Sequence, residues 1–368
     1  MKKGNMVVSP WEVSGQINYD KLLKDFGVNK IDEKIKSSIG VHPLTKREIY
    51  FAHRDADKWV AEAKKGKKVS ILTGRGPSER MHLGHLVPFL IAKSLQDTFD
   101  CDVYIPISDD EKFYVKENLD FEKVNEYSKD NVLDLIALGF KPGKTFIFQD
   151  FAYTEIYKYA AQVAKKITYS TAKAAFGLKP ENNIGWSFYP AMQAAHILFP
   201  QFHKGKHMTL VPVAIDQDPF IRLTRDIAEQ FGFEKPAAIH AKFMPSLYGE
   251  TKMSSSNSGL SVIFLDDDKK TVEQKIKRYA FSGGQKSIEE HRKLGGDPDI
   301  DVSFQYLKMF FEPDDKKLKK IYDDYRTGRL LTSELKEILI KRINEFLEEH
   351  RKKKAEAKKH LDKFLLKN

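Results

Sequence analysis

The stretch Thr73-Gly74-Arg75-Gly76-Pro77-Ser78-Glu79-Arg80-Met81-His82-Leu83-Gly84-His85 decides the fold class of this chain. It follows the apolar run Val69 to Leu72 and opens an apolar-periodic segment that continues to Phe99, so it predicts a strand, a glycine turn and a helix. Backbone N–H groups at a helix start are unpaired and the helix dipole is positive there. The stretch therefore predicts a phosphate-binding site, in which the glycines allow a nucleotide to approach the backbone.

The sequence around this turn alternates between strand-like and helix-like segments. Strands are predicted at Val69 to Leu72, Val103 to Ser108, Thr145 to Gln149, Leu210 to Ile215 and Ala238 to His240. This alternation predicts an α/β fold with a doubly wound, Rossmann-like parallel sheet. The interval near 111–189 is mostly helical in pattern and is predicted to be an insertion into the sheet domain.

The helical patterns divide the rest of the chain. Residues 1–62 mix short apolar groups with helix-like pieces and form an N-terminal extension, residues 63–265 form the α/β domain, and residues 266–368 form an all-helical C-terminal domain. Within the last domain, one helix is expected from Asp314 to near Gly328 and another from Thr332.

Two short motifs carry the chemistry. His82 and His85 lie three residues apart, so one face of the first helical turn can present both imidazoles as N–H donors to a polyphosphate. Lys252, in Thr251-Lys252-Met253-Ser254-Ser255-Ser256, would bring a mobile positive charge from the far side, and the serines would offer hydrogen bonds to a leaving pyrophosphate. Reaction at an α-phosphate builds charge on phosphorus oxygens, which fixed donors stabilise. Either motif alone is weak, and their combination predicts a nucleotide site.

Composition limits the remaining function classes. The net charge of +10, from 62 Lys and Arg against 52 Asp and Glu, favours an anionic partner, although lysine runs are typical of solvated helix faces. Cys101 is the only cysteine, which excludes an intramolecular disulfide and a cysteine-cluster zinc site. Asp266-Asp267-Asp268 indicates a helix cap rather than a metal site, so no protein-bound metal is expected. The sequence lacks a membrane-length apolar run and a secretory signal at Met1 to Asn5, and we expect a cytoplasmic protein.

The motifs also resemble those of a known enzyme class. His82-Leu83-Gly84-His85 and Lys252-Met253-Ser254-Ser255-Ser256 are similar to the two ATP motifs of class I aminoacyl-tRNA synthetases. The surrounding sequence resembles the tryptophanyl-tRNA synthetases of archaeal and eukaryotic type over most of the chain. The segments that carry this resemblance are 9–13, 51–55, 108–112, 189–195, 214–220, 280–284, 288–292 and 301–304.

The resemblance implies an activity and a set of site residues. The enzyme would condense tryptophan with Mg-ATP to tryptophanyl-adenylate and transfer the acyl group to the terminal adenosine of tRNA(Trp), as a homodimer, with Mg²⁺ arriving on ATP. Charge on the phosphates would be stabilised by four catalytic residues, His82, His85, Lys252 and Ser254. ATP would contact Thr73, Gly74, Arg75, Gly76, His82, Gly84, His85, Asp216, Lys252, Met253, Ser254 and Ser255. The amino acid would contact Leu72, Glu111, Gln193 and Gln217. The C-terminal domain would bind the tRNA anticodon, with Lys308, Arg326 and Arg329 as phosphate contacts.

Two positions depart from the eukaryotic pattern. A tyrosine before the glycine turn and a glutamine before the Asp-Asp-Glu segment meet the indole N–H there, whereas this chain has Leu72 and Pro106. The indole N–H is only a donor, so it needs another acceptor, for which Ser70, Ser108 and an ordered water are candidates. The alternatives are a tyrosine-specific or orphan class I synthetase, a small-molecule adenylyltransferase, in which similar H-x-G-H turns occur, and a non-catalytic RNA-binding protein.

Overall fold

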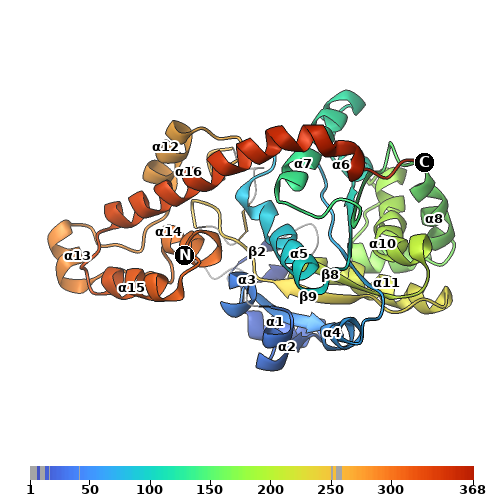
Figure 1. Cartoon of the computed structure of the whole chain (residues 1–368), viewed down its shortest axis with the longest axis horizontal. Helices are drawn as coiled ribbons and strands as arrows, with labels where there is room; N and C mark the ends of the chain where they lie inside the picture. Colours follow the sequence, from blue (N-terminus) through green and yellow to red (C-terminus); the bar gives the residue numbers. More distant parts are fainter. Residues whose placement is uncertain (1–5, 9–12, 16, 41, 250–251, 254–258) are drawn as a thin grey trace.

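The computed structural model describes residues 1–368 except 1–5, 9–12, 16, 41, 250–251 and 254–258. A seven-stranded sheet forms its centre (Figure 1). The strand order is β3 (Asn29–Lys30), β4 (Tyr50–Arg54), β9 (Ala237–Ala241), β8 (Met208–Ala214), β5 (Val69–Leu72), β6 (Asp102–Ile107) and β7 (Thr145–Gln149). The strands from β9 to β7 are parallel, which confirms the predicted doubly wound sheet and its five strands.

The sheet order places a ligand site at the end of β5. β5 pairs with β6 on one side and with β8 on the other, with Val69 opposite Met208 and Ser70 opposite Asp102. All four residues of β5 are buried, which explains why three of them are apolar and why the pattern does not alternate with exposed polar residues. The strands that follow β5 in the chain lie first on one side of it, as β6 and β7, and then on the other side, as β8 and β9. A crevice opens at such a reversal, beyond the carboxyl end of β5, where the glycine turn lies.

Helices cover both faces of the sheet. α5 (Leu86–Phe99) follows the glycine turn, and α11 (Asp218–Gln230) follows β8. The interval near 111–189, predicted as a helical insertion, overlaps α6 (Asp109–Val115), α7 (Phe121–Ala137), α8 (Glu155–Ala164), α9 (Tyr169–Phe176) and the start of α10 (Ile184–Lys204). It also includes β7, which is a strand of the central sheet. α10 packs closely against α8 and α11, so its residues reach the interior of the molecule.

The N-terminal segment joins the same sheet. β3 and β4 add two antiparallel strands beside β9, and β1 (Val7–Val8) pairs with β2 (Val13–Ser14) in a separate hairpin. The helices of this segment are α1 (Tyr19–Phe26), α2 (Glu33–Ser38), α3 (Pro43–Lys46) and α4 (Ala56–Lys64).

The segment after Leu265 is helical. It contains α12 (Lys269–Tyr279), α13 (Ile288–Leu294), α14 (Val302–Tyr306), α15 (Asp315–Arg326) and α16 (Thr332–Ala357). The side chain of Asp268 accepts a hydrogen bond from the Thr271 N–H at the start of α12, as the capping interpretation predicted. A π-helical turn covers Leu307–Phe311, and a 3₁₀ segment covers Lys358–Lys363.

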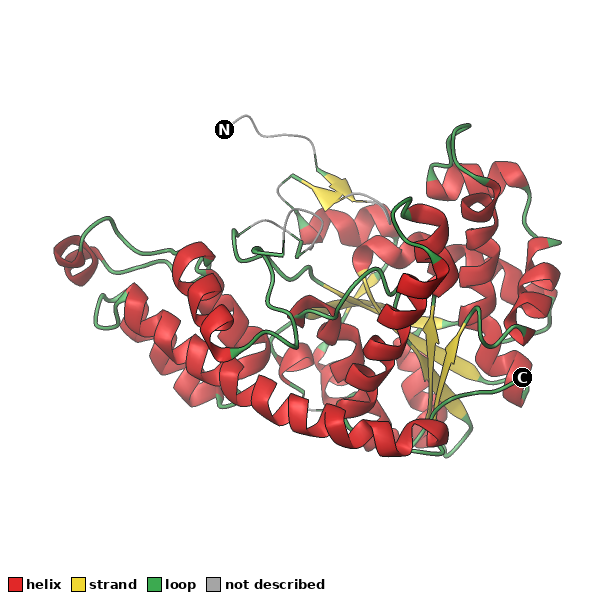
Figure 2. Ribbon diagram, turned by 90° about the horizontal axis from the view of Figure 1, so that it is seen from above, coloured by secondary structure: helices red, strands yellow, loops and turns green. Residues whose placement is uncertain are grey.

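The long helix α16 connects this helical segment to the sheet domain (Figure 2). It packs on α7, where His350 contacts the carboxylate of Asp134 at 2.8 Å. After α16 the chain returns to the sheet edge, and Leu365 forms a parallel bridge with Ile147 of β7. Cys101 is buried, as expected for a small core residue. None of the helices in the described part of the chain has the length and apolarity needed to cross a membrane.

Candidate active site

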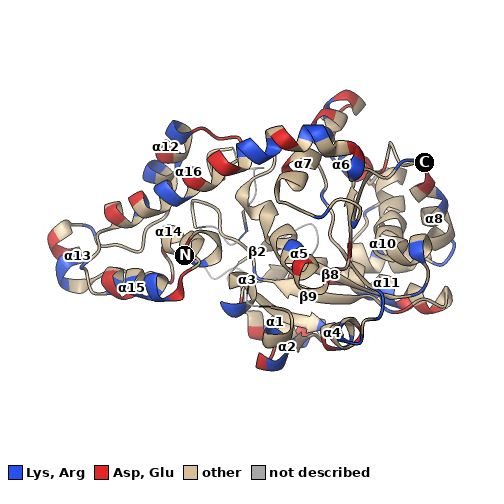
Figure 3. Ribbon diagram, in the orientation of Figure 1, with Lys and Arg blue, Asp and Glu red and all other residues tan. Residues whose placement is uncertain are grey.

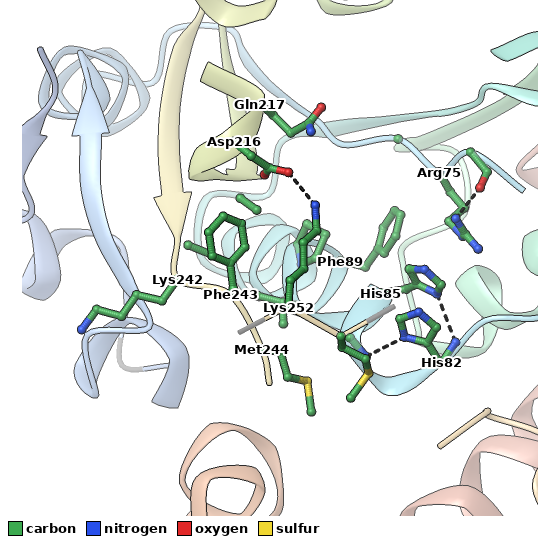
Figure 4. Close-up of a pocket in the computed structure, with 18 of the residues that line it drawn as sticks. Arg75, His82, His85, Phe89, Asp216, Gln217, Lys242, Phe243, Met244 and Lys252 are labelled. Atoms are coloured by element: carbon green, nitrogen blue, oxygen red, sulfur yellow. Dashed lines mark hydrogen bonds and ion pairs between the residues drawn. The ribbon is translucent and has the colours of Figure 1, made fainter. Parts of the chain in front are cut away.

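A cavity of about 340 Å³ lies at the carboxyl edge of the sheet (Figure 4). Three loops form its walls, after β5, after β8 and after β9, as the sheet order requires. Among the predicted ATP residues, the wall contains Gly74, Arg75, Gly76, His82, Gly84, His85, Asp216, Lys252 and Met253. Ser254 and Ser255 lie outside the described residues. Sequence reasoning missed Lys242, Phe243 and Met244, which line the same cavity from the end of β9.

The two imidazoles stack on one another beside the cavity. His82 precedes the short 3₁₀ turn Leu83–His85, not an α-helical turn, and the ring centroids of His82 and His85 are 3.5 Å apart. Nδ1 of His82 accepts the Gly84 N–H at 3.2 Å, and Nδ1 of His85 accepts the His82 N–H at 3.1 Å. Since each Nδ1 is an acceptor, each ring carries its proton on Nε2 and keeps that N–H as a donor.

Burial keeps both imidazoles neutral. Burial, and then the charge of Arg75, lowers the pKa of His82 to about 3. The same two causes, in the same order, hold the pKa of His85 well below its ordinary value. Two neutral N–H donors can approach each other without charge repulsion, which suits them to bind phosphate oxygens rather than to transfer protons.

The glycines make room for neighbouring side chains. A Cβ on Gly76 would lie 2.6 Å from the carboxylate of Glu111 and 2.3 Å from Cε of Lys112. A Cβ on Gly84 would lie 3.0 Å from Sδ of Met253, and that sulfur accepts the Gly84 N–H. The glycines therefore also allow the turn to pack against α6 and against the loop that carries Lys252.

Arg75 is a buried cation with an incomplete set of partners. Its Nε donates to Asn131 at 3.0 Å, and one Nη donates to the carbonyl of Gly76. The other Nη has no hydrogen-bond partner among the described residues. Burial lowers the pKa of Arg75 to about 10, so the guanidinium is charged at neutral pH and can bind an anion in the cavity.

Lys252 and Asp216 form an ion pair across the cavity, with Nζ 2.6 Å from Oδ2 (Figure 4). Asp216 lies in the 3₁₀ turn Ile215–Gln217 after β8 and is fully buried, whereas the Lys252 side chain is 40% exposed. The other carboxylate oxygen of Asp216 has no partner among the described residues. The Lys252 side chain points toward Asp216, on a different wall of the cavity from the two imidazoles (Figure 4).

The four residues predicted to bind the amino-acid substrate lie on four different elements. Gln217 lines the cavity itself. Glu111 is bound to Lys112 at 2.7 Å and lies against Gly76. Gln193 accepts a hydrogen bond from the Tyr189 hydroxyl at 2.7 Å, one turn earlier on α10. Leu72 belongs to a buried apolar cluster that includes Tyr189 and other residues of α10.

A buried polar cluster lies behind these residues, and the sequence analysis did not identify it. Carboxylate oxygens of Asp109, Asp110 and Asp150 lie within 4.8 Å of one another. Nε2 of His196 is 2.8 Å from the Asp150 carboxylate, and both side chains are fully buried. Burial raises the pKa of Asp109 to about 7 and raises the pKa of Asp110 and Asp150 well above their usual range. At this spacing the three carboxyl groups share protons, which removes the like-charge repulsion.

The structure excludes Ser70 as an acceptor for a substrate. Its hydroxyl is 3.0 Å from the Thr209 hydroxyl and 3.0 Å from Nε2 of His207. Ser70 is near the start of β5, so this network lies toward the edge of the sheet opposite the cavity. The prediction of Ser70 as an acceptor for the indole N–H was therefore wrong. The position of a residue along its strand decides which edge of the sheet its side chain lies near, and this position was not considered for Ser70.

Comparison with known proteins places this site in a family. Residues 64–348 match the family model of class I tRNA synthetases for tryptophan and tyrosine. A tryptophan–tRNA ligase of Sulfurisphaera tokodaii is 53% identical over 97% of this chain and 94% of its own length. The tryptophanyl-tRNA synthetase structure from Plasmodium falciparum has a TM-score of 0.84 at 40% identity over 92% of both chains. That from Encephalitozoon cuniculi, bound to tryptophan, has a TM-score of 0.86 at 35% identity over 95% of this chain and 98% of its own.

The parallel sheet and the match over residues 64–348 identify the chain as a class I aminoacyl-tRNA synthetase. Within that class, the chain belongs to the tryptophan–tRNA ligase family, because the match to these relatives extends over nearly its whole length.

Proposed function

We propose that the cavity binds ATP with its phosphates between the two imidazoles and Lys252, and that the carboxylate of tryptophan attacks the α-phosphate there. Pyrophosphate leaves, and the resulting tryptophanyl-adenylate transfers its acyl group to the terminal adenosine of tRNA(Trp). The observation that carries the proposal is the arrangement of the donors: His82 and His85 line one wall of the cavity, and Lys252 lines another.

The imidazoles act as fixed donors and Lys252 as a mobile one. The Nε2–H groups are held by the backbone hydrogen bonds to Nδ1, so they need no reorganisation as charge builds on the phosphate oxygens. Lys252 exchanges its bond to Asp216 for the phosphates, and Asp216 becomes available to the ribose hydroxyls. Arg75 binds the triphosphate with its unpartnered Nη.

The lining of the cavity supports Mg²⁺ entry on ATP. Among the described residues that line the cavity, Asp216 is the one carboxylate, and it is bound to Lys252. The wall therefore offers little to a metal on its own, and phosphate oxygens and waters supply the ligands that Mg²⁺ prefers.

The amino acid occupies the region between Gln217, Glu111 and α10. Its ammonium group needs acceptors, which the carboxylate of Glu111 and the amide oxygens of Gln193 and Gln217 provide. Leu72 and the apolar cluster around it supply the wall for the indole ring.

The C-terminal helices contact the tRNA in this proposal. Lys and Arg residues are distributed along α12, α13, α15 and α16 (Figure 3). A second cavity of about 480 Å³ between α12, α13 and α16 is lined by Lys277, Lys286 and Lys336. Lysines at a cavity suit phosphate contacts, as do the predicted residues Lys308, Arg326 and Arg329. We also propose that the protein is a homodimer, as the resemblance implies. A cytoplasmic location belongs to the proposal too, because aminoacylated tRNA is used there in protein synthesis.

Lys252→Ala tests the phosphate role. We expect tryptophan-dependent exchange of pyrophosphate into ATP to fall by about 10²- to 10³-fold, the usual cost of losing one charge-stabilising donor. The Kd of tryptophan, measured by equilibrium binding, should change less than about 2-fold, because uniform binding of the amino acid does not use Lys252.

Lys242→Ala is the matched control. Lys242 lines the same cavity, but its Nζ lies over the rings of Tyr19 and Phe51 and points away from the imidazoles (Figure 4). Exchange should stay close to that of the unchanged protein. An equal loss of exchange and of tryptophan binding in Lys252→Ala would show that Lys252 has no specific role at the phosphates.

A further inference from the structure

Burial of the tryptophan side chain requires an acceptor for the indole N–H. The acceptor inferred below rests on the amino-acid site of the proposed function. The indole nitrogen donates only, and a buried donor without a partner weakens binding. Leu72 is apolar and Pro106 has no polar side-chain atom, while Ser70 is bound to Thr209 and His207. The acceptors that remain are Ser108, an ordered water and any other unused acceptor beside the amino-acid site.

His196 lies on the helix that carries Gln193, one of the residues proposed to bind the amino acid. It is on α10, three residues after Gln193, so the two side chains leave adjacent turns of one helix face. Its ring centroid is 5.8 Å from that of Phe148, and Phe148 belongs to the same apolar cluster as Leu72 and Met192. The Asp110 side of its hydrogen-bond network adjoins Glu111, whose N–H donates to the Asp110 carboxyl group.

One nitrogen of His196 is an acceptor without a partner. Nε2 is bound to Oδ1 of Asp150 at 2.8 Å, whereas Nδ1 is buried and has no hydrogen-bond partner among the described residues. Burial lowers the pKa of His196 to about 4, so the ring is neutral. With the proton on Nε2 toward the carboxylate, Nδ1 carries the lone pair.

The neighbouring carboxyl groups fix this tautomer. Burial, and then the charge of Asp150, raise the pKa of Asp110, so Asp110 holds a proton. Burial raises the pKa of Asp150 as well, while its interaction with Asp110 acts in the opposite direction and favours the ionised form of Asp150. Oδ1 of Asp150 is the oxygen 2.8 Å from Nε2 of His196. An ionised Asp150 can only accept, so it requires the proton of His196 to be on Nε2.

The other unpartnered buried acceptors of the described chain lie elsewhere. Those of Tyr50 and Asp216 belong to the cavity assigned to ATP, those of His53 and His240 are on β4 and β9, and those of Ser303 and Asn344 are in the C-terminal helices. Oδ2 of Asp150 also has no partner among the described residues, and its carboxyl group is the one that holds the ring of His196. Of this set, only Nδ1 of His196 combines an unused lone pair with a position on the helix of Gln193.

We propose that Nδ1 of His196 accepts the indole N–H of tryptophan, with Asp150 and Asp110 holding the ring in the accepting tautomer. His196 is then a specificity-determining residue that takes the place left by Leu72 and Pro106. A side chain without a ring N–H leaves this acceptor unpaired and is rejected for that reason.

The experiment compares L-tryptophan with 3-benzothienyl-L-alanine, in which sulfur replaces the indole N–H, in pyrophosphate exchange by the intact protein. The unchanged protein should prefer tryptophan in kcat/KM by at least 10-fold. His196→Leu should lower kcat/KM for tryptophan by about 10- to 100-fold, mainly through KM, because the contact exists before and during the reaction. Its kcat/KM for the analogue should change less than about 3-fold, which also shows that the variant is folded.

His203→Leu is the matched control, because it makes the same substitution on the same helix. His203 is half-buried and its Nδ1 is 3.0 Å from the Tyr104 hydroxyl. It should keep the preference of the unchanged protein.

Two results would overturn the assignment of His196. One is an unchanged protein that uses both substrates equally, which needs no variant to fold. The other is a His196→Leu protein that keeps the preference or loses both substrates to the same extent. An unchanged protein that activates no amino acid would instead contradict the proposed function.

Discussion

Single residues in this site owe their chemistry to burial. His82 and His85 are neutral donors because burial opposes their protonation and because backbone N–H groups occupy both Nδ1 atoms. Lys252 and Asp216 compensate each other's charge in the cavity. The same principle, an ionisable group whose partner is fixed by the fold, governs His196 and Asp150.

The neutral state of His82 predicts a dependence of stability on pH. The pKa of His82 is about 3 in the folded protein and about 6.5 in an unfolded chain. Below pH 6.5 the unfolded chain therefore binds a proton that the native protein does not, so the free energy of unfolding falls as the pH falls from 6.5 toward 3. At pH 5 this one group costs about 2 kcal/mol relative to pH 7.

Urea unfolding at pH 7 and pH 5 measures this loss. His82→Gln should lose about 2 kcal/mol less than the unchanged protein between the two pH values, because glutamine does not titrate. His360→Gln, at an exposed position, should lose as much as the unchanged protein. Equal losses in all three proteins would mean that His82 is protonated in the native state.

Elements with their own periodicity could be predicted from the sequence, and elements that depend on distant partners could not. The five parallel strands follow from short apolar runs, and all are present. β3 is only Asn29–Lys30, and its pairing with β4 has no apolar signal. The return of Leu365 to the edge of β7 is likewise a contact between ends of the chain that no local pattern records.

The candidate site divides in the same way. The glycine turn, His82, His85 and Lys252 could be predicted because their chemistry is local to two motifs. The pairing of Lys252 with Asp216 and the contact of His196 with Asp150 join residues 36 and 46 positions apart, so only the fold reveals them. A histidine one turn after Gln193, with apolar residues directly before and after it in α10, was the available signal for His196.

One buried ion pair holds the turn that carries Asp216. Arg54, at the end of β4, donates to both carboxylate oxygens of Asp218 at 2.7 and 2.8 Å, and to the carbonyls of Phe26 and Gly27. Asp218 is fully buried and begins α11 directly after the 3₁₀ turn Ile215–Gln217. Arg54 therefore ties the N-terminal segment to the cavity wall.

Arg54→Leu should lower the free energy of unfolding by about 3 kcal/mol, because it removes the bidentate partner of a buried charge and leaves Asp218 with His240 at 3.0 Å and the half-exposed Arg222 at 3.4 Å. Adding Asp218→Asn should recover part of that loss, since the uncompensated charge is removed. Urea unfolding of the single and double variants gives both values. A single variant as stable as the unchanged protein would show that the pair does not hold the turn.

At the scale of the whole molecule, the sheet gathers residues from distant parts of the sequence at one edge. The reversal of strand order at β5 brings the loops after β5, β8 and β9 around one cavity. The helix α10, which carries Gln193, packs on β5 and β8. The helix α16 fixes the C-terminal helices to α7 through His350 and Lys354, each within 3 Å of Asp134. Activation of an amino acid and contact with tRNA thus depend on one connected body of structure.

The most direct measurement is exchange of labelled pyrophosphate into ATP by the intact protein, with tryptophan, tyrosine and phenylalanine each supplied separately. We expect exchange with tryptophan at a kcat/KM at least 100-fold above that with either of the others, because both lack the indole N–H and fill the pocket differently. Exchange that tyrosine supports as well as tryptophan, or that no amino acid supports, would contradict the assignment of this cavity to tryptophan activation.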